Sequence, residues 1–232
     1  MLKIRNLVEI MNRHISYIKQ FMTGNRKLKL TVILILFVVV TYAQKSIIEE
    51  RSVSKQFAIK EMNKSMILSR AEAWFTNEVN AEKNEVESID KESGIIVING
   101  VSEVLYKNIG RELYPKRSGM AEVLEARFGH QMKVKVNEND YEITYTVIDM
   151  KEEMYKKEDL FFACVDFESL KEENLEAYNK AMNKLLKANL VFKKRRELFM
   201  DNSKFQFEEV SGFLLTEGET NIFSLNEAIT LQ

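Results

Sequence analysis

The amino-acid sequence predicts an α+β fold in which two helices cover one face of an antiparallel sheet of about five strands. Three observations lead to this prediction. Residues 86–100 and 132–148 each have the pattern of a β-hairpin, residues 64–79 carry an apolar stripe at helical spacing, and residues 169–200 follow the helical period. A strand, a helix, paired strands and a closing helix in this order are typical of a sheet with helices on one side.

The first elements of this domain lie before residue 80. Residues 56–60 alternate between polar and apolar side chains and predict a short strand. Asn63 or Ser65 is placed to cap a helix over residues 64–79, because either side chain can accept a hydrogen bond from a free backbone N–H of the first turn. The apolar side chains of this helix recur at intervals of three and four residues and should face the sheet. They are Ile67, Ala71, Trp74 and Phe75.

Two hairpins form the body of the predicted sheet. In the first, residues 86–90 and 95–100 flank a Lys-Glu-Ser-Gly turn, in which Gly94 supplies the positive φ that such a turn needs. In the second, residues 132–136 and 141–148 alternate strictly between polar and apolar side chains. Strict alternation indicates one buried face and one wet face, as in an antiparallel sheet.

The rest of the chain is less regular. Residues 101–128 are ambiguous, although residues 120–128 are compatible with a short helix. The closing helix over residues 169–200 has acids at its start and Lys-Lys-Arg-Arg at 193–196 near its end, an order that complements the helix dipole. Residues 201–232 look β-like and predict a short C-terminal extension.

The N-terminal region predicts export. Residues 26–29 are basic, residues 30–40 are apolar, and residues 41–43 place small side chains at the positions that signal peptidase needs. An apolar helix of roughly 13 residues spans about 20 Å, short of the ~30 Å hydrocarbon core of a bilayer. We therefore expect cleavage after Ala43, and an inner-membrane anchor formed by residues 28–43 is the alternative.

Residues 1–21 precede a leader of normal length, so we expect translation to start at Met22 or Met11 as alternatives to Met1. Residues 44–54 are polar and charged, which is typical of a linker. The predicted organisation is a gene-model extension or disordered segment at 1–21, a signal peptide at 22–43, a linker at 44–54, the α+β domain at 55–200 and the extension at 201–232.

The charge distribution argues against nucleic acid as a partner. The formal net charge is −1, but residues 1–43 contain seven Lys or Arg and one acid, so the remaining residues carry −7. Binding of nucleic-acid phosphates needs a concentrated basic face, which an acidic body does not offer. The chain has one cysteine, so it cannot form an internal disulfide.

Few side chains after the leader can carry catalysis or bind a metal. His130 opens a strand and is expected at the surface or an interface, whereas Cys164 lies in an apolar run and is expected to be buried. With His14 they are too few for a zinc site, and Ser211 lacks the glycine spacing of a nucleophile elbow. Four acids lack EF-hand spacing and predict a solvated charge run: Asp149, Glu152, Glu153 and Asp159. We expect no catalytic, cofactor-binding or metal site, and no cofactor.

Two features keep a binding role open. Trp74 and Phe75 are expected in the core, with the lining of a ligand pocket as the alternative. The basic residues 193–196 are expected to be a charged helix end, with contact to anionic lipid or to a partner as the alternative.

Three stretches resemble one known family. Residues 63–75 look like its first helix, which carries an Arg-Ala pair and then Trp-Phe. Residues 86–100 are similar to its acidic turn, apolar strand and glycine, and residues 132–149 resemble its later hairpin. The family is domain of unknown function 4468, which has a TATA-box-binding-protein-like fold and occurs in exported proteins of Gram-negative bacteria. The resemblance covers roughly residues 55–150 and implies a fold but no activity.

This chain departs from the family pattern in two places. It has extra residues at 101–130, and Asn-Asp-Tyr-Glu at 139–142 stands where a Gly-Arg-Tyr-Arg-like strand start is usual. A role for that basic pair therefore does not transfer to this chain.

Together these observations predict an exported, periplasmic or envelope-associated protein that is not an enzyme. It should bind an unknown envelope protein or ligand through the open sheet face or the C-terminal residues. A carrier of a small molecule or lipid, held between helices and sheet, is the alternative, because 14 Phe and 11 Met allow a pliable apolar interior. A carboxylate-dependent hydrolase is the last alternative. Membrane contact is expected only through an uncleaved leader.

Overall fold

The computed structural model describes residues 46–59, 62–77, 85–151 and 158–231. The chain divides into two compact units, 1–45 and 46–232, and the described residues all belong to the second. The predicted extension, signal peptide and alternative membrane anchor lie outside the described residues. Within the described ranges, no helix has both the length and the apolar character that crossing a membrane requires.

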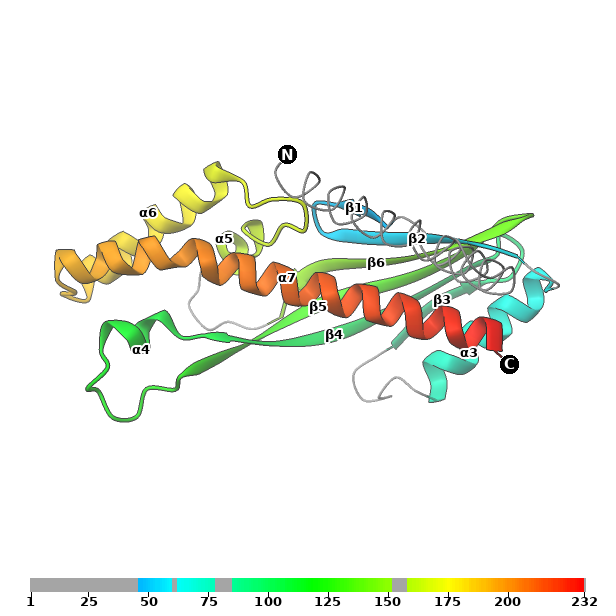
Figure 1. Ribbon diagram of the computed structural model, residues 1–232, viewed down its shortest axis with the longest axis horizontal. Helices are drawn as coiled ribbons and strands as arrows, with labels where there is room; N and C mark the ends of the chain where they lie inside the picture. Colours follow the sequence, from blue (N-terminus) through cyan, green and yellow to red (C-terminus); the bar gives the residue numbers. More distant parts are fainter. Residues whose placement is uncertain (1–45, 60–61, 78–84, 152–157, 232) are drawn as a thin grey trace, which may run out of the picture. The chain divides into compact units, whose positions relative to one another are not determined.

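A six-stranded antiparallel sheet is the framework of the second unit (Figure 1). The strands are β1 (Ile47–Glu49), β2 (Ser52–Ala58), β3 (Glu85–Asp90), β4 (Ile95–Lys107), β5 (Val123–Val136) and β6 (Asp140–Met150). Their order in the sheet is β1-β2-β6-β5-β4-β3. The predicted α+β class and antiparallel sheet are confirmed, with one more strand than expected.

Both predicted hairpins are present. The β3–β4 turn contains Gly94 with a φ of 76°, and the Asp90 carboxylate accepts hydrogen bonds from the backbone N–H groups of Glu92 and Ser93, each at 3.0 Å. In the β5–β6 hairpin, buried and half-buried residues alternate along β6. The alternation in the sequence therefore marks one packed face and one face that no described helix covers.

The ambiguous segment extends the two central strands of the sheet. After β4 comes the short α4 (Ile109–Leu113), and β5 begins at Val123, so the short helix considered for residues 120–128 is wrong. Phe128 pairs with Ser102 of β4 and is fully buried. Pairing along the whole of β4 satisfies this backbone, and burial of the strand outweighs a weak local preference for helix.

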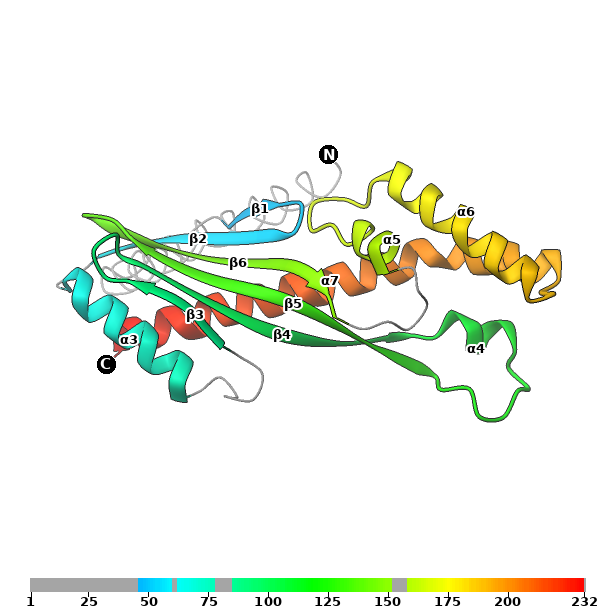
Figure 2. The ribbon, with the colours of Figure 1, turned by 180° about the vertical axis from the view of Figure 1, so that it is seen from behind.

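The helices lie on one face of the sheet, as Figures 1 and 2 show from opposite sides. They are α3 (Lys64–Asn77), α5 (Glu158–Ala163), α6 (Glu172–Ala188) and α7 (Lys193–Leu231). Helices α3, α5 and α7 pack on the strands, whereas α6 packs on α5 and α7. The two covering helices that the sequence predicted are thus joined by further helical segments.

Helix α3 agrees with its prediction. Asn63 Oδ1 accepts a hydrogen bond from the backbone N–H of Met66 at 2.9 Å and so caps the first turn. Trp74 and Phe75 are 6% and 5% exposed, and Trp74 Nε1 donates to Ser224 Oγ of α7 at 3.2 Å. Their interpretation as core residues is confirmed.

The C-terminal part differs most from the expectation. Residues 169–200 do not form one helix, because α6 ends at Ala188 and α7 begins at Lys193. The β-like extension at 201–232 is also wrong, since α7 continues to Leu231. Buried residues of α7 recur every three or four positions, which is the helical period. They include Phe199, Ser203, Phe207, Val210, Leu214, Gly218, Ile222, Leu225 and Ile229.

The predicted linker at 44–54 contains β1 and the start of β2. Val53 is fully buried and pairs with Tyr145 of β6. Lys55 is only 5% exposed, and its Nζ lies 3.7 Å from the centre of the Phe223 ring. The polar composition hid this strand because a lysine can bury its apolar stem on the face that α7 covers.

Candidate functional site

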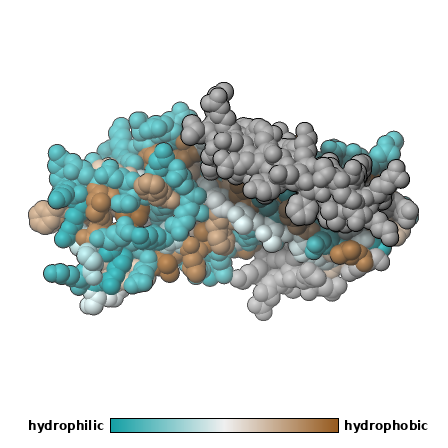
Figure 3. Space-filling view, in the orientation of Figure 1, coloured by the Kyte–Doolittle hydropathy of each residue, from teal (hydrophilic) through white to brown (hydrophobic). Residues whose placement is uncertain are grey.

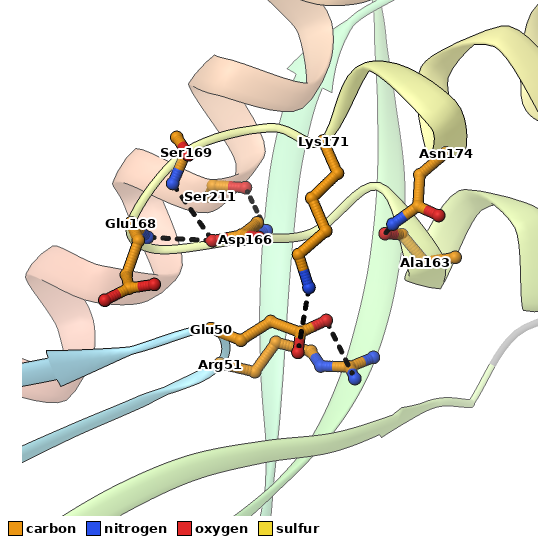
Figure 4. Close-up of polar contacts among 9 residues, drawn as sticks. All are labelled: Glu50, Arg51, Ala163, Asp166, Glu168, Ser169, Lys171, Asn174 and Ser211. Atoms are coloured by element: carbon orange, nitrogen blue, oxygen red, sulfur yellow. Dashed lines mark hydrogen bonds and ion pairs between the residues drawn. The ribbon is translucent and has the colours of Figure 1, made fainter.

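The turn between α5 and α6 lies against α7 and forms one wall of a groove. The Asp166 carboxylate accepts hydrogen bonds from the backbone N–H groups of Glu168 (2.9 Å) and Ser169 (3.0 Å). The backbone N–H of Asp166 donates to Ser211 Oγ of α7 at 3.1 Å (Figure 4). Aspartate often closes its own turn because its short side chain reaches N–H groups two and three residues ahead. The turn is therefore held in shape and fixed to α7.

The β1–β2 turn holds the same segment from the other side. The backbone N–H of Phe167 donates to the Glu50 carbonyl at 2.6 Å. The Glu50 carboxylate lies 3.2 Å from Lys171 Nζ and 3.3 Å from Arg51 Nη2 (Figure 4). These ion pairs are largely solvated and contribute little, so the backbone hydrogen bonds do most of the positioning.

The groove between this turn and α7 has a volume of about 380 Å³. Apolar side chains that are buried or half-buried contribute to it, namely Phe167, Leu170, Phe207 and Leu215. Charged side chains also line it, namely Asp166, Glu168, Lys204 and Glu208. Three of these side chains are acids and one is a lysine, so the formal charge of the lining is negative. Lys204 Nζ lies 4.0 Å from Glu208 Oε1. Such a groove suits a ligand that combines an apolar part with a positive charge.

A second polar group lies buried under α7. Ser102 of β4 places its Oγ 2.8 Å from Nδ1 of His130 on β5 and 2.9 Å from the hydroxyl of Tyr145 on β6. The rings of His130 and Tyr145 have centroids 4.9 Å apart. His130 is only 7% exposed, so its predicted place at the surface or an interface is wrong.

Burial keeps this cluster uncharged near neutral pH. It lowers the pKa of His130 to about 4 and raises the pKa of Tyr145, which the negative charge of Glu217 raises further. Burial also raises the pKa of Glu217 on α7, whose Oε2 is buried without a hydrogen-bond partner. A Cβ atom on Gly218 would lie 2.5 Å from the Tyr145 ring, so α7 is closed tightly over the cluster.

Burial also decides what the cluster can do chemically. The distance between Ser102 and His130 would suit a nucleophile and its base. However, Ser102 is 1% exposed and Tyr145 fully buried, so no substrate can reach the hydroxyl while α7 is in place. Cys164 is fully buried as expected, and burial raises the pKa of its thiol to about 12.

The remaining predicted residues are dispersed. Asp149 Oδ2 lies 2.9 Å from Lys151 Nζ, and Asp159 lies in the first turn of α5. Glu152 and Glu153 are outside the described residues. Across the part of the chain that the structure describes, no three His, Cys, Asp or Glu side chains are grouped so as to hold a metal ion.

The basic residues 193–196 open α7 and do not end a helix, so the predicted match to the helix dipole is wrong. The Arg195 guanidinium lies 4.3 Å from the centre of the Tyr114 ring. Arg196 donates to Asn183 Oδ1 at 2.9 Å, whereas the neighbouring lysines, Lys193 and Lys194, are exposed. Only part of the basic run is therefore engaged in packing.

Sequence reasoning missed the groove. The available signal was an aspartate with a serine three residues later, Asp166 and Ser169, which is typical of an Asx turn. The sequence gives Ser211 no nucleophile elbow, and in the structure its Oγ accepts the hydrogen bond that fixes the turn. Its role depends on the helical state of residues that were expected to be β-like.

The sheet region is the part of the chain that is similar to a known family. Residues 54–151 match the model of a family described as a domain of unknown function (DUF4468) with TBP-like fold. The chain is similar to the crystal structure of a DUF4468 family protein from Bacteroides ovatus ATCC 8483, with 15% identity and a TM-score of 0.32, over 42% of this chain and 53% of that one. It is also similar to a TBP-like protein from Parabacteroides distasonis ATCC 8503, with 16% identity and a TM-score of 0.35, over 72% and 92% of the two chains. No curated protein matches the chain.

Proposed function

We propose that this chain, whose residues 54–151 match the model of the DUF4468 family with TBP-like fold, is an exported binding module of the cell envelope and not an enzyme. One observation carries the proposal: the groove beside α7 is open and lined with charges, whereas Ser102, His130 and Cys164 are buried. Binding needs an accessible recess with fixed walls, and the Asp166 turn provides one.

The chemistry of the groove selects its partner. Its apolar side chains favour an apolar group. Its acids outnumber its one lysine, Lys204, which lies beside Glu208, so the groove also favours a cation. A volume of about 380 Å³ is at the small end of ligand pockets. We infer that it takes a short protein segment with a lysine or arginine next to an apolar side chain.

The carrier alternative has less support. Large side chains that are fully buried, among them Tyr141, Phe128 and Phe207, fill the space between the sheet and the helices. Carboxylate-dependent hydrolysis would need two acids that converge on a substrate. In the groove, the Asp166 carboxylate instead accepts two backbone hydrogen bonds.

The export part of the proposal rests on the leader sequence at 22–43. A reporter enzyme that is active only outside the cytoplasm, fused behind Gln44 in a Gram-negative host, tests it directly. Activity of the reporter is expected. A fusion that stays inside the cell would overturn the envelope role without affecting the groove.

The groove is tested with short synthetic peptides that place one lysine beside one leucine, compared with peptides in which glutamate replaces the lysine. Fluorescence anisotropy should show a preference for the basic peptide. Reversing two groove charges with Glu168→Lys and Glu208→Lys should weaken that binding about tenfold. Glu227→Lys, at an exposed acid near the end of α7, is the matched control and should change little. Equal binding of both peptides, or equal effects of the groove and control variants, would refute the proposal that the groove binds a basic segment.

A further inference from the structure

The turn that joins α6 to α7, residues 189–192, presents two large apolar side chains to solvent. Leu190 is 88% exposed and Phe192 is 76% exposed, whereas Val191 between them is buried at 9%. Burial of Val191 fixes the turn, so its two neighbours point outward from a defined position. We call Leu190 and Phe192 together the apolar tip.

The backbone at Leu190 makes this exposure unusual. The N–H of Val191 donates to the Leu186 carbonyl at 2.9 Å, and the N–H of Leu190 donates to the Lys187 carbonyl at 3.1 Å. These two bonds form a Schellman motif, whose left-handed position glycine usually occupies. Leu190 has a φ of 57° there, the one positive φ of a non-glycine residue in the described ranges. Folding alone would favour glycine, so an exposed leucine calls for a reason outside the fold.

Basic side chains surround the apolar tip. Between residues 180 and 198 the sequence has seven Lys or Arg and one acid, a formal charge of +6 in a chain whose net charge is −1. The acid, Glu197, lies 3.6 Å from Lys193. The exposed lysines of this segment are Lys180, Lys184, Lys187, Lys193 and Lys194.

A second basic segment lies at the same end of the unit. The α6–α7 turn and α4 extend beyond the same ends of β4 and β5 (Figures 1 and 2). Arg195 contacts Tyr114, and the segment after α4 exposes Lys116 and Arg117. In Figure 3, hydrophilic side chains dominate this end, with apolar ones among them.

We propose that the apolar tip docks on an anionic phospholipid bilayer. Leu190 and Phe192 enter the headgroup region, and Lys187, Lys193 and Lys194 contact the lipid phosphates. Apolar side chains flanked by lysines match the membrane interface, where the apolar groups enter the acyl boundary and the ammonium groups remain at the phosphates. A protruding tip cannot enclose a small ligand, and nucleic acid would give the exposed leucine no apolar environment. This contact is separate from the groove, and it is also separate from the membrane contact that only an uncleaved leader would make.

A site-specific label tests the insertion. The full chain with Leu190→Cys carries an environment-sensitive fluorophore at the tip, while Cys164 stays unlabelled because it is buried. Vesicles of phosphatidylethanolamine and phosphatidylglycerol should increase and blue-shift the emission, and phosphatidylcholine vesicles should not. The control label at Lys91→Cys lies in the β3–β4 turn, at the opposite end of β4 from α4, and should not respond. No response at Leu190, or equal responses at both positions, would overturn the proposal.

Substitutions in the full chain test which side chains contribute to vesicle binding. Every variant keeps residues 1–45, so a difference in binding between variants comes from the substituted residue. Leu190→Gly suits the local backbone and should still weaken vesicle binding about tenfold, and Phe192→Ser should do the same. Lys193→Glu with Lys194→Glu should weaken it by more than tenfold and reduce its dependence on salt. Phe213→Ser removes an exposed phenylalanine of α7 that lies outside the apolar tip and should leave binding unchanged.

The outcomes distinguish a lipid bilayer from a second copy of this chain as the partner of the apolar tip. Vesicle binding that is the same in Leu190→Gly and the unaltered chain would refute the lipid proposal. A concentration-dependent dimer that Leu190→Gly abolishes would instead assign the tip to a second copy of this chain, and would also overturn it. Neither result affects the peptide test of the groove, so the two proposals fail independently.

Discussion

Lowering the pH from about 7.5 to about 5 should destabilise the protein through His130 by about 2 kcal/mol. Burial lowers the pKa of this histidine from 6.5 to about 4. Between these two values the unfolded chain binds a proton that the folded chain does not bind, so stability falls as the pH falls through this window. The loss reaches about 3 kcal/mol below the folded pKa. It is absent well above 6.5, where both states are neutral.

Urea unfolding of the unaltered protein and of His130→Gln at the two pH values measures this effect. Glutamine can keep the hydrogen bond to Ser102 but does not titrate. Glu217 works in the opposite direction, because its raised pKa contributes stability that is lost as the pH rises. Glu217 is present in both proteins, so the difference in unfolding free energy between them isolates His130. That difference should change by about 2 kcal/mol between the two pH values. If the difference in unfolding free energy between the two proteins did not depend on pH, His130 would not be buried and neutral as the structure indicates.

Three further predictions concern folding and reactivity. Gly218→Ala should destabilise the protein by about 1–3 kcal/mol, because the new Cβ would meet the Tyr145 ring at 2.5 Å. Gly212→Ala, in the same helix with nothing within 4 Å, should stabilise it by about 0.5–1 kcal/mol, and urea unfolding that ranks the two alike would contradict the packing. Leu190→Gly should raise stability by about 1 kcal/mol, because it relieves the left-handed backbone; a loss of stability in the same assay would show that leucine suits the turn. Cys164 should react with a thiol reagent no faster than the protein opens, and immediate labelling of the native chain would disprove its burial.

Local sequence patterns were sufficient where one element carries its own signal. The stripe of α3, its Asn63 cap and the Gly94 turn each depend on residues within a few positions of one another. The strict alternation of the β5–β6 hairpin likewise reports a face that is buried by whatever covers it. These features were predictable because local propensity and tertiary packing favour the same structure.

The features that the sequence did not predict depend on contacts between residues that are far apart in the chain. Phe205 and Phe207 resemble strand alternation, yet Phe207 is fully buried and Phe205 is 67% exposed on a helix that crosses the sheet. His130 could not be recognised as buried while the residues that cover it were assigned to an extension. The groove depends on the hydrogen bond between Asp166 and Ser211, which lie 45 residues apart in the chain. In each case, the error in α7 was passed on to the site.

Helix α7 also determines whether the two proposed contacts can exist together. Lys193 opens it and Lys204 is the first residue of α7 that lines the groove, so at 1.5 Å per residue the groove begins about 16 Å along the helix from the tip. A bilayer that α7 meets end-on leaves the groove in water, open to a partner, because the lipid headgroup region of one leaflet is only about 5–8 Å thick. A helix that lies flat would instead bring the exposed Leu198 and Phe205, seven residues apart on one face, to the lipid. Asp201 lies between them on that face and opposes anionic lipid, which favours the end-on arrangement.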